Sequence, residues 1–431
     1  MAPPADRRIE GYSAHAMTTK IKPSSRFARL ALLAGALALF ATACEYRPEK
    51  GLVKHESEGK GGDHGAPEET QEPDPSSTEN ITDPGLGPTN PPPKPQGGYG
   101  LKLLAGSGAR SYADGKGASA AFVQPIGIAV DADGNVVVAD AGANRIRKVA
   151  KDGTVTTIAG SGEEGAANGA ATDATFRGPR GVAIGVDGTI YVADTGNHLI
   201  RTIGPNGTVA TLAGSPGKKG LKNAPGAGAL FNAPIGIGIG PDGTLFVTEF
   251  DNHTIRVVSK DGKIVRQLAG TGVKGFKDEA ALKAQFDSPV GIAVDAKGVV
   301  YVADAANNRI RKIADGKVST LAGSRAGFKD GPGKDALLNI PYGLALAEDG
   351  NIYLTEFANN TVRRLDTKGA VTTIFASKDQ QSVDSGTASP SPSPAKSKKE
   401  ILQLPAGIAS VGGKLYVANS GQSKIQIVAK S

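Results

Sequence analysis

Residues 179–203 read PRGVAIGVDGTIYVADTGNHLIRTI and contain three short signals for β-strands. One run of small and apolar residues ends before Asp187-Gly188, a second ends at Asp194, and a third begins at Leu199. An Asp-Gly pair between such runs predicts a hairpin, because glycine accepts the positive φ that a tight turn needs. The stretch therefore predicts three successive strands of one antiparallel sheet.

The same pattern occurs six times, at intervals of 52 to 64 residues. A second Gly-containing turn and a run such as TVTTIAG follow the third strand in most copies, which adds a fourth strand. Four antiparallel strands repeated at a regular period predict the blades of a β-propeller. The copies begin at Pro125, Pro179, Pro234, Pro289, Pro341 and Pro405.

The ends of the repeated region predict how the ring closes. The sixth copy ends at IQIVAKS without a fourth strand, whereas residues 101–106, LKLLAG, form a spare copy of that strand ahead of the first unit. Pairing them removes an exposed sheet edge. The predicted fold is all-β: a six-bladed propeller over residues 101–431, closed by its N-terminal strand. An apolar residue three positions before each proline is expected to be buried: Phe122, Phe176, Phe231, Phe286, Leu338 and Leu402.

The repeats resemble NHL repeats, which are named for the Asn-His-Leu found here at Asn197, His198 and Leu199. The resemblance covers roughly residues 101–431 and includes the surrounding PxGIAVDxxGxxYVAD pattern. It implies a six-bladed propeller that in most cases is a binding scaffold, although relatives include lyases and lactonase-like hydrolases. The fold alone therefore does not name the function.

The first hundred residues have a different composition. Residues 1–44 contain a basic start, an apolar run over 30–43 and a lipobox-like end at Cys44, which predicts a secretory signal with lipidation of this cysteine; a plain cleaved signal is the alternative, and Met17 is an alternative start. Residues 45–100 are acidic and rich in Pro and Gly, which predicts a flexible tether. A Ser-Pro and Lys insertion at 378–400 is expected to be a disordered loop. The expected location is the cell envelope, lipid-anchored to a membrane or periplasmic or extracellular.

Charge and composition limit the partners. The formal net charge is +7, with +9 on residues 101–431, a balance that suits anionic surfaces. The export signal argues against nucleic acid as a partner. The chain holds one cysteine, so a disulfide framework is excluded. We expect a monomer whose partner is a protein or small ligand on one propeller face.

Two polar patterns repeat and are interpreted as structural. An acid ends the second strand of five copies and an arginine follows seven residues later, as in Asp194 and Arg201; the sixth copy has Asn419 and Gln426 instead. Such a carboxylate is expected to accept turn N–H groups or to pair with the arginine. His198 and His253 share a position with Asn or Ser in the other copies, and two histidines do not make a three-ligand catalytic zinc site. No metal or cofactor is expected.

The candidate site lies where the copies differ from one another. Residues after the repeat prolines are expected near the mouth of the central channel, where four are apolar and two are not. Repacking of the blades is the alternative explanation for these differences. The expected function is binding; the alternative is a lyase or lactonase-like hydrolase acting at the channel mouth, and no catalytic residue is assigned. The predicted ligand-binding residues are Arg180, Tyr342, Glu249, Phe250, Glu356 and Phe357.

Overall fold

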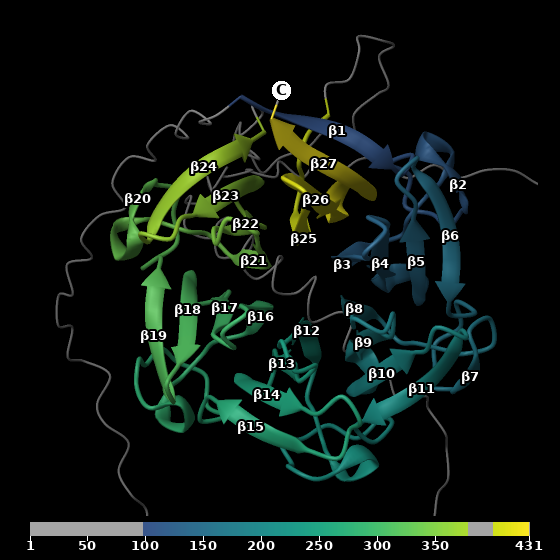
Figure 1. The fold of residues 1–431 in the computed structure, drawn as a ribbon, viewed down its shortest axis with the longest axis horizontal. Helices are drawn as coiled ribbons and strands as arrows, with labels where there is room; N and C mark the ends of the chain where they lie inside the picture. Colours follow the sequence, from purple (N-terminus) through teal and green to yellow (C-terminus); the bar gives the residue numbers. More distant parts are fainter. Residues whose placement is uncertain (1–97, 378–399, 431) are drawn as a thin grey trace, which may run out of the picture. The chain divides into compact units, whose positions relative to one another are not determined.

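The computed structural model describes residues 98–377 and 400–430. The predicted signal, the tether up to residue 97, Cys44 and the insertion at 378–399 lie outside these residues. The described residues form six antiparallel sheets around a central axis, as Figure 1 shows. Each sheet is one blade and contains four long strands, so the predicted six-bladed, all-β propeller is confirmed.

The blades follow one another along the chain. Blade 1 contains β3 (Pro125–Val130), β4 (Val136–Asp140), β5 (Arg145–Val149) and β6 (Thr154–Ala159). Blade 2 contains β8 (Pro179–Ile184), β9 (Ile190–Asp194), β10 (Leu199–Ile203) and β11 (Thr208–Ala213). Blade 3 contains β12 (Pro234–Ile239), β13 (Leu245–Glu249), β14 (Thr254–Val258) and β15 (Val265–Ala269). Blade 4 contains β16 (Pro289–Val294), β17 (Val300–Asp304), β18 (Arg309–Ala314) and β19 (Lys317–Ala322).

Blade 5 contains β21 (Pro341–Leu346), β22 (Ile352–Glu356), β23 (Thr361–Leu365) and β24 (Ala370–Ala376). Blade 6 contains β25 (Pro405–Val411), β26 (Lys414–Asn419), β27 (Lys424–Lys430) and β1 (Tyr99–Ala105). Two-residue strands β2 (Gly115–Lys116), β7 (Gly169–Ala170) and β20 (Gly331–Pro332) pair with the outer strands of blades 1, 2 and 5. The helices in the described residues are 3-10 turns: η1 (Gly117–Ser119), η2 (Ala141–Ala143), η3 (Thr195–Asn197), η4 (Gly226–Gly228), η5 (Ala281–Lys283), η6 (Gly333–Asp335) and η7 (Ser420–Gln422). None of these described helices is long or apolar enough to cross a membrane.

The N-terminal strand closes the ring. β1 pairs antiparallel with β27, with Tyr99 opposite Lys430 and Ala105 opposite Ile425, so the first and last parts of the propeller share blade 6. The outer edge of blade 6 is therefore covered by a strand from the other end of the domain (Figure 1). The closure expected from the spare LKLLAG copy is confirmed.

The centre of the ring is held by close backbone contacts between first strands. The third residue of each first-strand motif is glycine, and a Cβ placed there would lie 2.0–2.5 Å from a carbonyl oxygen of the next blade. For example, a Cβ on Gly236 would stand 2.2 Å from the Val290 carbonyl oxygen. Neighbouring blades can approach this closely only because no side chain intervenes. The six contacts run from Gly127 to Arg180, Gly181 to Ile235, Gly236 to Val290, Gly291 to Tyr342, Gly343 to Ala406 and Gly407 to Ile126.

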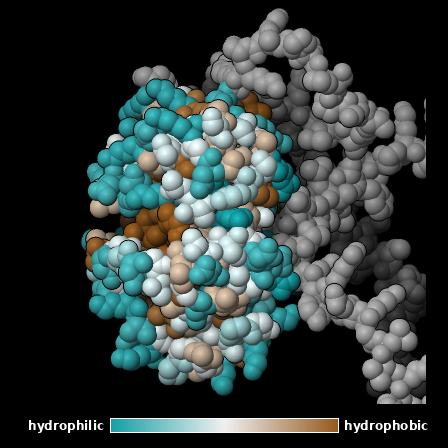
Figure 2. Space-filling view, turned by 90° about the vertical axis from the view of Figure 1, so that its right-hand side faces the viewer, coloured by the Kyte–Doolittle hydropathy of each residue, from teal (hydrophilic) through white to brown (hydrophobic). Residues whose placement is uncertain are grey.

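Apolar side chains fill the spaces between blades. All six residues expected to be buried ahead of the repeat prolines are at most 2% exposed, which confirms that the long connections fold back into the domain. In one cluster, Tyr191 and Ala213 of blade 2 pack with Val247 of blade 3. Figure 2 shows the side of the propeller formed by blades 1 and 2. Its surface is mostly hydrophilic, with one apolar area.

Candidate functional site

The repeated acids and arginines form buried ion pairs. Asp194, at the end of β9, and Arg201, in β10, have side chains with no exposure to solvent, and Asp194 Oδ2 lies 2.9 Å from Arg201 Nη1. Opposite charges in adjacent strands compensate each other where water cannot. The other four pairs are Asp140–Arg147 (3.3 Å), Glu249–Arg256 (3.1 Å), Asp304–Arg311 (2.6 Å) and Glu356–Arg363 (2.6 Å).

Each pair also binds the connection that leads into its blade. Asp194 accepts the backbone N–H of Arg177, and Arg201 donates to the carbonyl oxygens of Thr175 and Ala167 and to the Asn168 side chain. The predicted pairing with arginine is confirmed. The N–H donors, however, belong to the connection before the first strand and not to the turn after the second strand. The pair therefore fastens a long loop to the blade.

In the sixth blade a neutral amide pair takes the place of the ion pair. Asn419 Nδ2 donates to Gln426 Oε1 at 2.7 Å, and Asn419 Oδ1 accepts the backbone N–H of Gln403 at 2.8 Å. Both side chains are buried. Acid and arginine have thus been replaced together, which is consistent with their acting as a unit.

Burial affects the protonation of these acids. It raises the pKa of Asp194 to about 6, while hydrogen bonds from Asn197 and from the Arg177 N–H and the charge of Arg201 favour the ionised form. Burial also raises the pKa of Asp304 to about 6, against the charge of Arg311. Because these groups are sealed inside the blades, the raised values reflect the cost of burying a charge.

Glu249 and Glu356, two of the predicted ligand-binding residues, belong to this network. Glu249 accepts hydrogen bonds from Arg256, Thr254 and the Asn232 backbone. Glu356 accepts the matching set from Arg363, Thr361 and the Asn339 backbone. The structure places both carboxylates inside their blades, fully buried, and not on the surface of the channel mouth.

Each residue of the Asn197-His198-Leu199 triplet has a structural contact. Asn197 Nδ2 donates to Asp194 and to the Gly165 carbonyl oxygen, and Leu199 is fully buried. His198 has φ 58°, in the left-handed region, and its Nδ1 accepts the backbone N–H of Ala233 at 3.1 Å. Because Ala233 precedes the first strand of blade 3, this hydrogen bond joins two blades.

Four of the other five copies make the same bond between blades, whereas in the sixth copy the Ser423 hydroxyl donates to the Val123 carbonyl oxygen. His253 Nδ1 accepts from the backbone of Ser288 at 3.1 Å. Asn144, Asn308 and Asn360 use Oδ1 to accept from Gly178, Ile340 and Leu404. Asparagine can therefore replace histidine here, since both accept one hydrogen bond and tolerate a positive φ.

We expect His198→Asn to leave the fold intact and to weaken the pH dependence of stability. Burial lowers the pKa of both His198 and His253, because a proton on the ring would be poorly solvated and would block Nδ1 as an acceptor. The stability that the two neutral histidines contribute is fully present above their pKa in the unfolded chain, about 6.5. It is lost as the pH falls through their lower pKa in the folded protein. Thermal unfolding at pH 7 and pH 5 should therefore show a smaller acid loss in His198→Asn than in the wild type. Equal losses would contradict this role.

Three of the predicted site residues belong to two blades on opposite sides of the ring, and all three are largely buried: Arg180 is 6% exposed, Tyr342 3% and Phe357 6%. Arg180, on β8, and Tyr342, on β21, belong to blades on opposite sides of the ring (Figure 1). Burial raises the pKa of Tyr342 to about 12, and the positive charge of Arg180 opposes this shift. Tyr342 also stacks on Phe357, with ring centroids 5.7 Å apart. Phe250, the matching residue of blade 3, is half-buried after β13.

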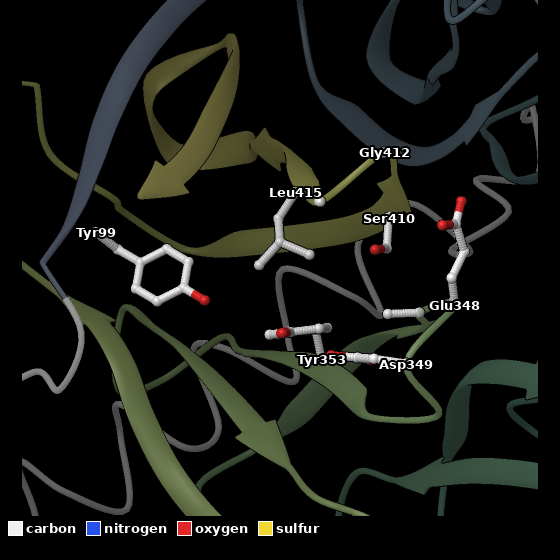
Figure 3. A pocket seen from close by; sticks show the side chains of 9 residues that line it. Tyr99, Glu348, Asp349, Tyr353, Ser410, Gly412 and Leu415 are labelled. Atoms are coloured by element: carbon white, nitrogen blue, oxygen red, sulfur yellow. The ribbon is translucent and has the colours of Figure 1, made fainter. Parts of the chain in front are cut away.

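A small hollow that the sequence did not predict lies between blades 5 and 6. Tyr99, Tyr353, Ser410 and Leu415 line it together with turn residues (Figure 3). The first two strands of blade 6 are joined by two residues, Gly412-Gly413, whereas five residues join them in every other blade. The shorter hairpin leaves about 150 Å³ of space beside the longer turn of blade 5.

Within the described parts of the chain, no group of three or more His, Cys, Asp or Glu side chains is placed to hold a metal ion. The acids that recur in the blades have arginine partners, and the two recurring histidines accept backbone N–H groups. The recurring acids and the two histidines therefore stabilise the fold.

These features define a six-bladed β-propeller with one ion-paired or amide-paired network per blade. Residues 122–149, 176–203 and 286–313 each match the NHL repeat family. The chain therefore contains NHL repeats and builds its propeller from them.

Similar proteins include the chloroplastic protein SUPPRESSOR OF QUENCHING 1 of Arabidopsis thaliana, 32% identical over 64% of this chain and 27% of the plant protein. Human NHL repeat-containing protein 2 is 28% identical over 68% of this chain and 44% of its own length. The chain thus spans less than half of either relative. A solved protein of unknown function from Bacteroides thetaiotaomicron shares the fold, with a TM-score of 0.55, 17% identity and coverage of 77% and 76% of the two chains.

Proposed function

We propose that this propeller is a binding scaffold whose ligand lies at the end of the channel that contains Arg180 and Tyr342. The observation that supports this most strongly is that Arg180 and Tyr342 occupy the same position, directly after the repeat proline, in blades on opposite sides of the ring. The equivalent positions in the other four blades are apolar: Ile126, Ile235, Val290 and Ala406. A guanidinium and a phenol at two of six equivalent positions give one end of the channel a chemistry that the repeat does not require.

The residues suggest a class of ligand. An arginine binds carboxylate or phosphate groups through paired hydrogen bonds. Tyr342 and Phe357 add a stacked aromatic surface beside it, which favours an apolar or aromatic part of a ligand. We therefore propose a small organic anion, or the carboxylate of a peptide, as the ligand class.

The state of the recurring acids supports binding over catalysis. Glu249 and Glu356 make charge-compensated contacts deep in their blades, and a general acid or base has to reach the proton it transfers. A lyase or lactonase-like hydrolase would need its acids at the channel mouth. This alternative predicts a chemical product, which the binding proposal does not.

The binding proposal is tested with Arg180→Ala in the full chain. A panel of aromatic and aliphatic carboxylates and phosphates is screened by thermal shift, and hits are measured by calorimetry. We expect at least one hit to be recovered unchanged and to bind Arg180→Ala about 10- to 100-fold more weakly, since a charge-assisted contact contributes about 1.5–3 kcal/mol. Lys260→Ala, an exposed lysine in a turn after β14, is the matched control and should bind as the wild type does.

Two results would contradict the proposal. Equal affinity of Arg180→Ala and the wild type for every hit would remove the ligand from this end of the channel. Conversion of a hit to a product, followed by mass spectrometry, would favour the enzyme alternative.

We further propose that the chain is exported and anchored to a membrane of the cell envelope through lipidated Cys44. The support is the basic start, the apolar run at 30–43 and the cysteine that directly follows ATA. Cys44→Ala should abolish incorporation of a labelled fatty acid and release the protein from the membrane fraction. Retained label in Cys44→Ala would end the proposal.

A further inference from the structure

Two neighbouring connections expose large apolar side chains. Leu221, between blades 2 and 3, is 41% exposed; Val273 and Phe276, between blades 3 and 4, are 61% and 45% exposed. The connections touch, because a Cβ on Gly272 would stand 3.2 Å from Leu221 Cδ2. We call Leu221, Val273 and Phe276, with the lysines described next, the apolar-basic rim.

Exposed lysines surround these apolar side chains. Residues 214–233 contain Lys218, Lys219 and Lys222 and no acid, in the sequence KKGLK around Leu221. By contrast, the connection at 160–178 contains three acids and one arginine. The connection at 214–233 therefore carries a net charge of +3, whereas the connection at 160–178 carries −2.

The next connection adds further lysines. Lys274 and Lys277 are exposed beside Val273 and Phe276. Of the two acids that follow, Asp278 binds the buried Arg311 at 2.8 Å, and Glu279 lies 3.5 Å from Lys277. Asp278 is thus used by its blade network, while Glu279 offsets part of one lysine charge at the surface.

Packing within the fold accounts for only part of this rim. The Phe276 ring lies against Arg309, whose guanidinium carbon is 3.8 Å from the ring centroid. Tyr112 holds the same place on Arg145 in the connection before blade 1. Such stacking accounts for an aromatic ring in each connection. It does not account for exposed Leu221 and Val273, or for lysines on both sides of Leu221.

We propose that the apolar-basic rim docks on the surface of an anionic lipid bilayer. Apolar side chains can enter the interface between headgroups and acyl chains while lysines bind anionic headgroups, each contributing about 1 kcal/mol near the surface. An acidic protein partner would use the charge but would not need Leu221 and Val273 to be so exposed. The combination of both properties favours the lipid surface.

The length of chain between Cys44 and Gly98 is compatible with this docking. Residues 45–97 separate the predicted lipid anchor from the first described residue. Fully extended, 53 residues reach at most about 175–190 Å. The propeller could therefore reach the same bilayer that holds the anchor, and docking would fix which face of the ring points away from it.

The chain lacks tryptophan, which provides a site-specific test. Phe276→Trp in the full chain with Cys44→Ala places one fluorophore in the rim. Tyr112→Trp, in the same background, is the matched control, because it stands at the equivalent position of another connection and is 43% exposed. Both are titrated with phosphatidylcholine vesicles with and without phosphatidylglycerol.

We expect a blue shift of Phe276→Trp emission with the anionic vesicles, and a much smaller shift for Tyr112→Trp. Adding Lys218→Glu and Lys219→Glu should raise the lipid concentration for half-maximal shift by about 10-fold or more, in line with two lost lysine contacts and two new repulsions. No shift, equal shifts at both positions, or equal shifts with neutral vesicles would overturn the proposal. A larger shift with a soluble acidic polypeptide than with vesicles would also overturn it and would favour a protein partner.

Discussion

Gly236→Ala should lower the free energy of unfolding by about 3 kcal/mol, because the new Cβ would stand 2.2 Å from the Val290 carbonyl oxygen. Both groups belong to first strands at the centre of the ring, and neither can move without displacing a blade. The Thr248 hydroxyl would lie 2.9 Å from the same Cβ, so the new methyl group cannot shift in that direction either. Denaturant unfolding of the purified variant measures the loss.

Gly238→Ala is the matched control on the same strand. Its Cβ would meet a methyl group of Val294 at 3.0 Å, which a side chain can relieve, and alanine already stands at this position in the other five blades. We expect a change of less than about 1 kcal/mol, since alanine suits a strand interior better than glycine does. An equal loss of unfolding free energy in the two variants would show that the close backbone contacts at the centre of the ring do not determine its stability.

Arg201→Gln should cost about 3–5 kcal/mol, because it leaves the Asp194 carboxylate buried without its charge partner. The hydrogen bonds from Arg201 to Thr175 and Ala167 would be lost as well, which loosens the connection before blade 2. Chemical denaturation again gives the magnitude, and a lower protease resistance around residues 160–178 would locate the effect.

Blade 6 supplies the matched rescue. Asp194→Asn combined with Arg201→Gln reproduces the neutral Asn419–Gln426 pair, in which Nδ2 and Oε1 are 2.7 Å apart. The double variant should recover about 2 kcal/mol or more relative to Arg201→Gln, since no buried charge remains. If the two single losses simply add, the acid and the arginine do not act as a unit.

The sequence was sufficient for the architecture because the signals are local and repeated. Asp-Gly turns between apolar runs located the hairpins, and the spare strand at 101–106 located the closure. The burial of Phe176 and its counterparts followed from their fixed distance to the repeat prolines. Each signal occurred several times, so accidental agreement was improbable.

The contacts between blades were not visible in the sequence. His198 and Ala233 are 35 residues apart, and nothing in their spacing shows that Nδ1 accepts the Ala233 N–H. The stacking of Phe357 on Tyr342, with ring centroids 5.7 Å apart, likewise has no signal in the sequence. The hollow beside Gly412-Gly413 could have been found by counting, because that hairpin is shorter than its counterparts.

Residues that recur in the repeats have structural roles, whereas the candidate binding residues differ between blades. The Asn-His-Leu triplet and the acid–arginine pairs occur in similar form around the ring and hold its blades together. Arg180 and Tyr342 occur once each at their position in the repeat, and Phe357, whose counterpart in blade 3 is Phe250, stacks on Tyr342. Binding is therefore expected to depend on residues that the repeat does not share.

The most direct test compares His198→Asn and Arg180→Ala for affinity to one anionic ligand from the panel. Isothermal titration of both variants and the wild type at pH 7 gives the three dissociation constants. We predict an unchanged constant for His198→Asn and one about 10- to 100-fold higher for Arg180→Ala. The opposite order, with binding lost in His198→Asn and retained in Arg180→Ala, would place the site in the repeat itself and contradict this account.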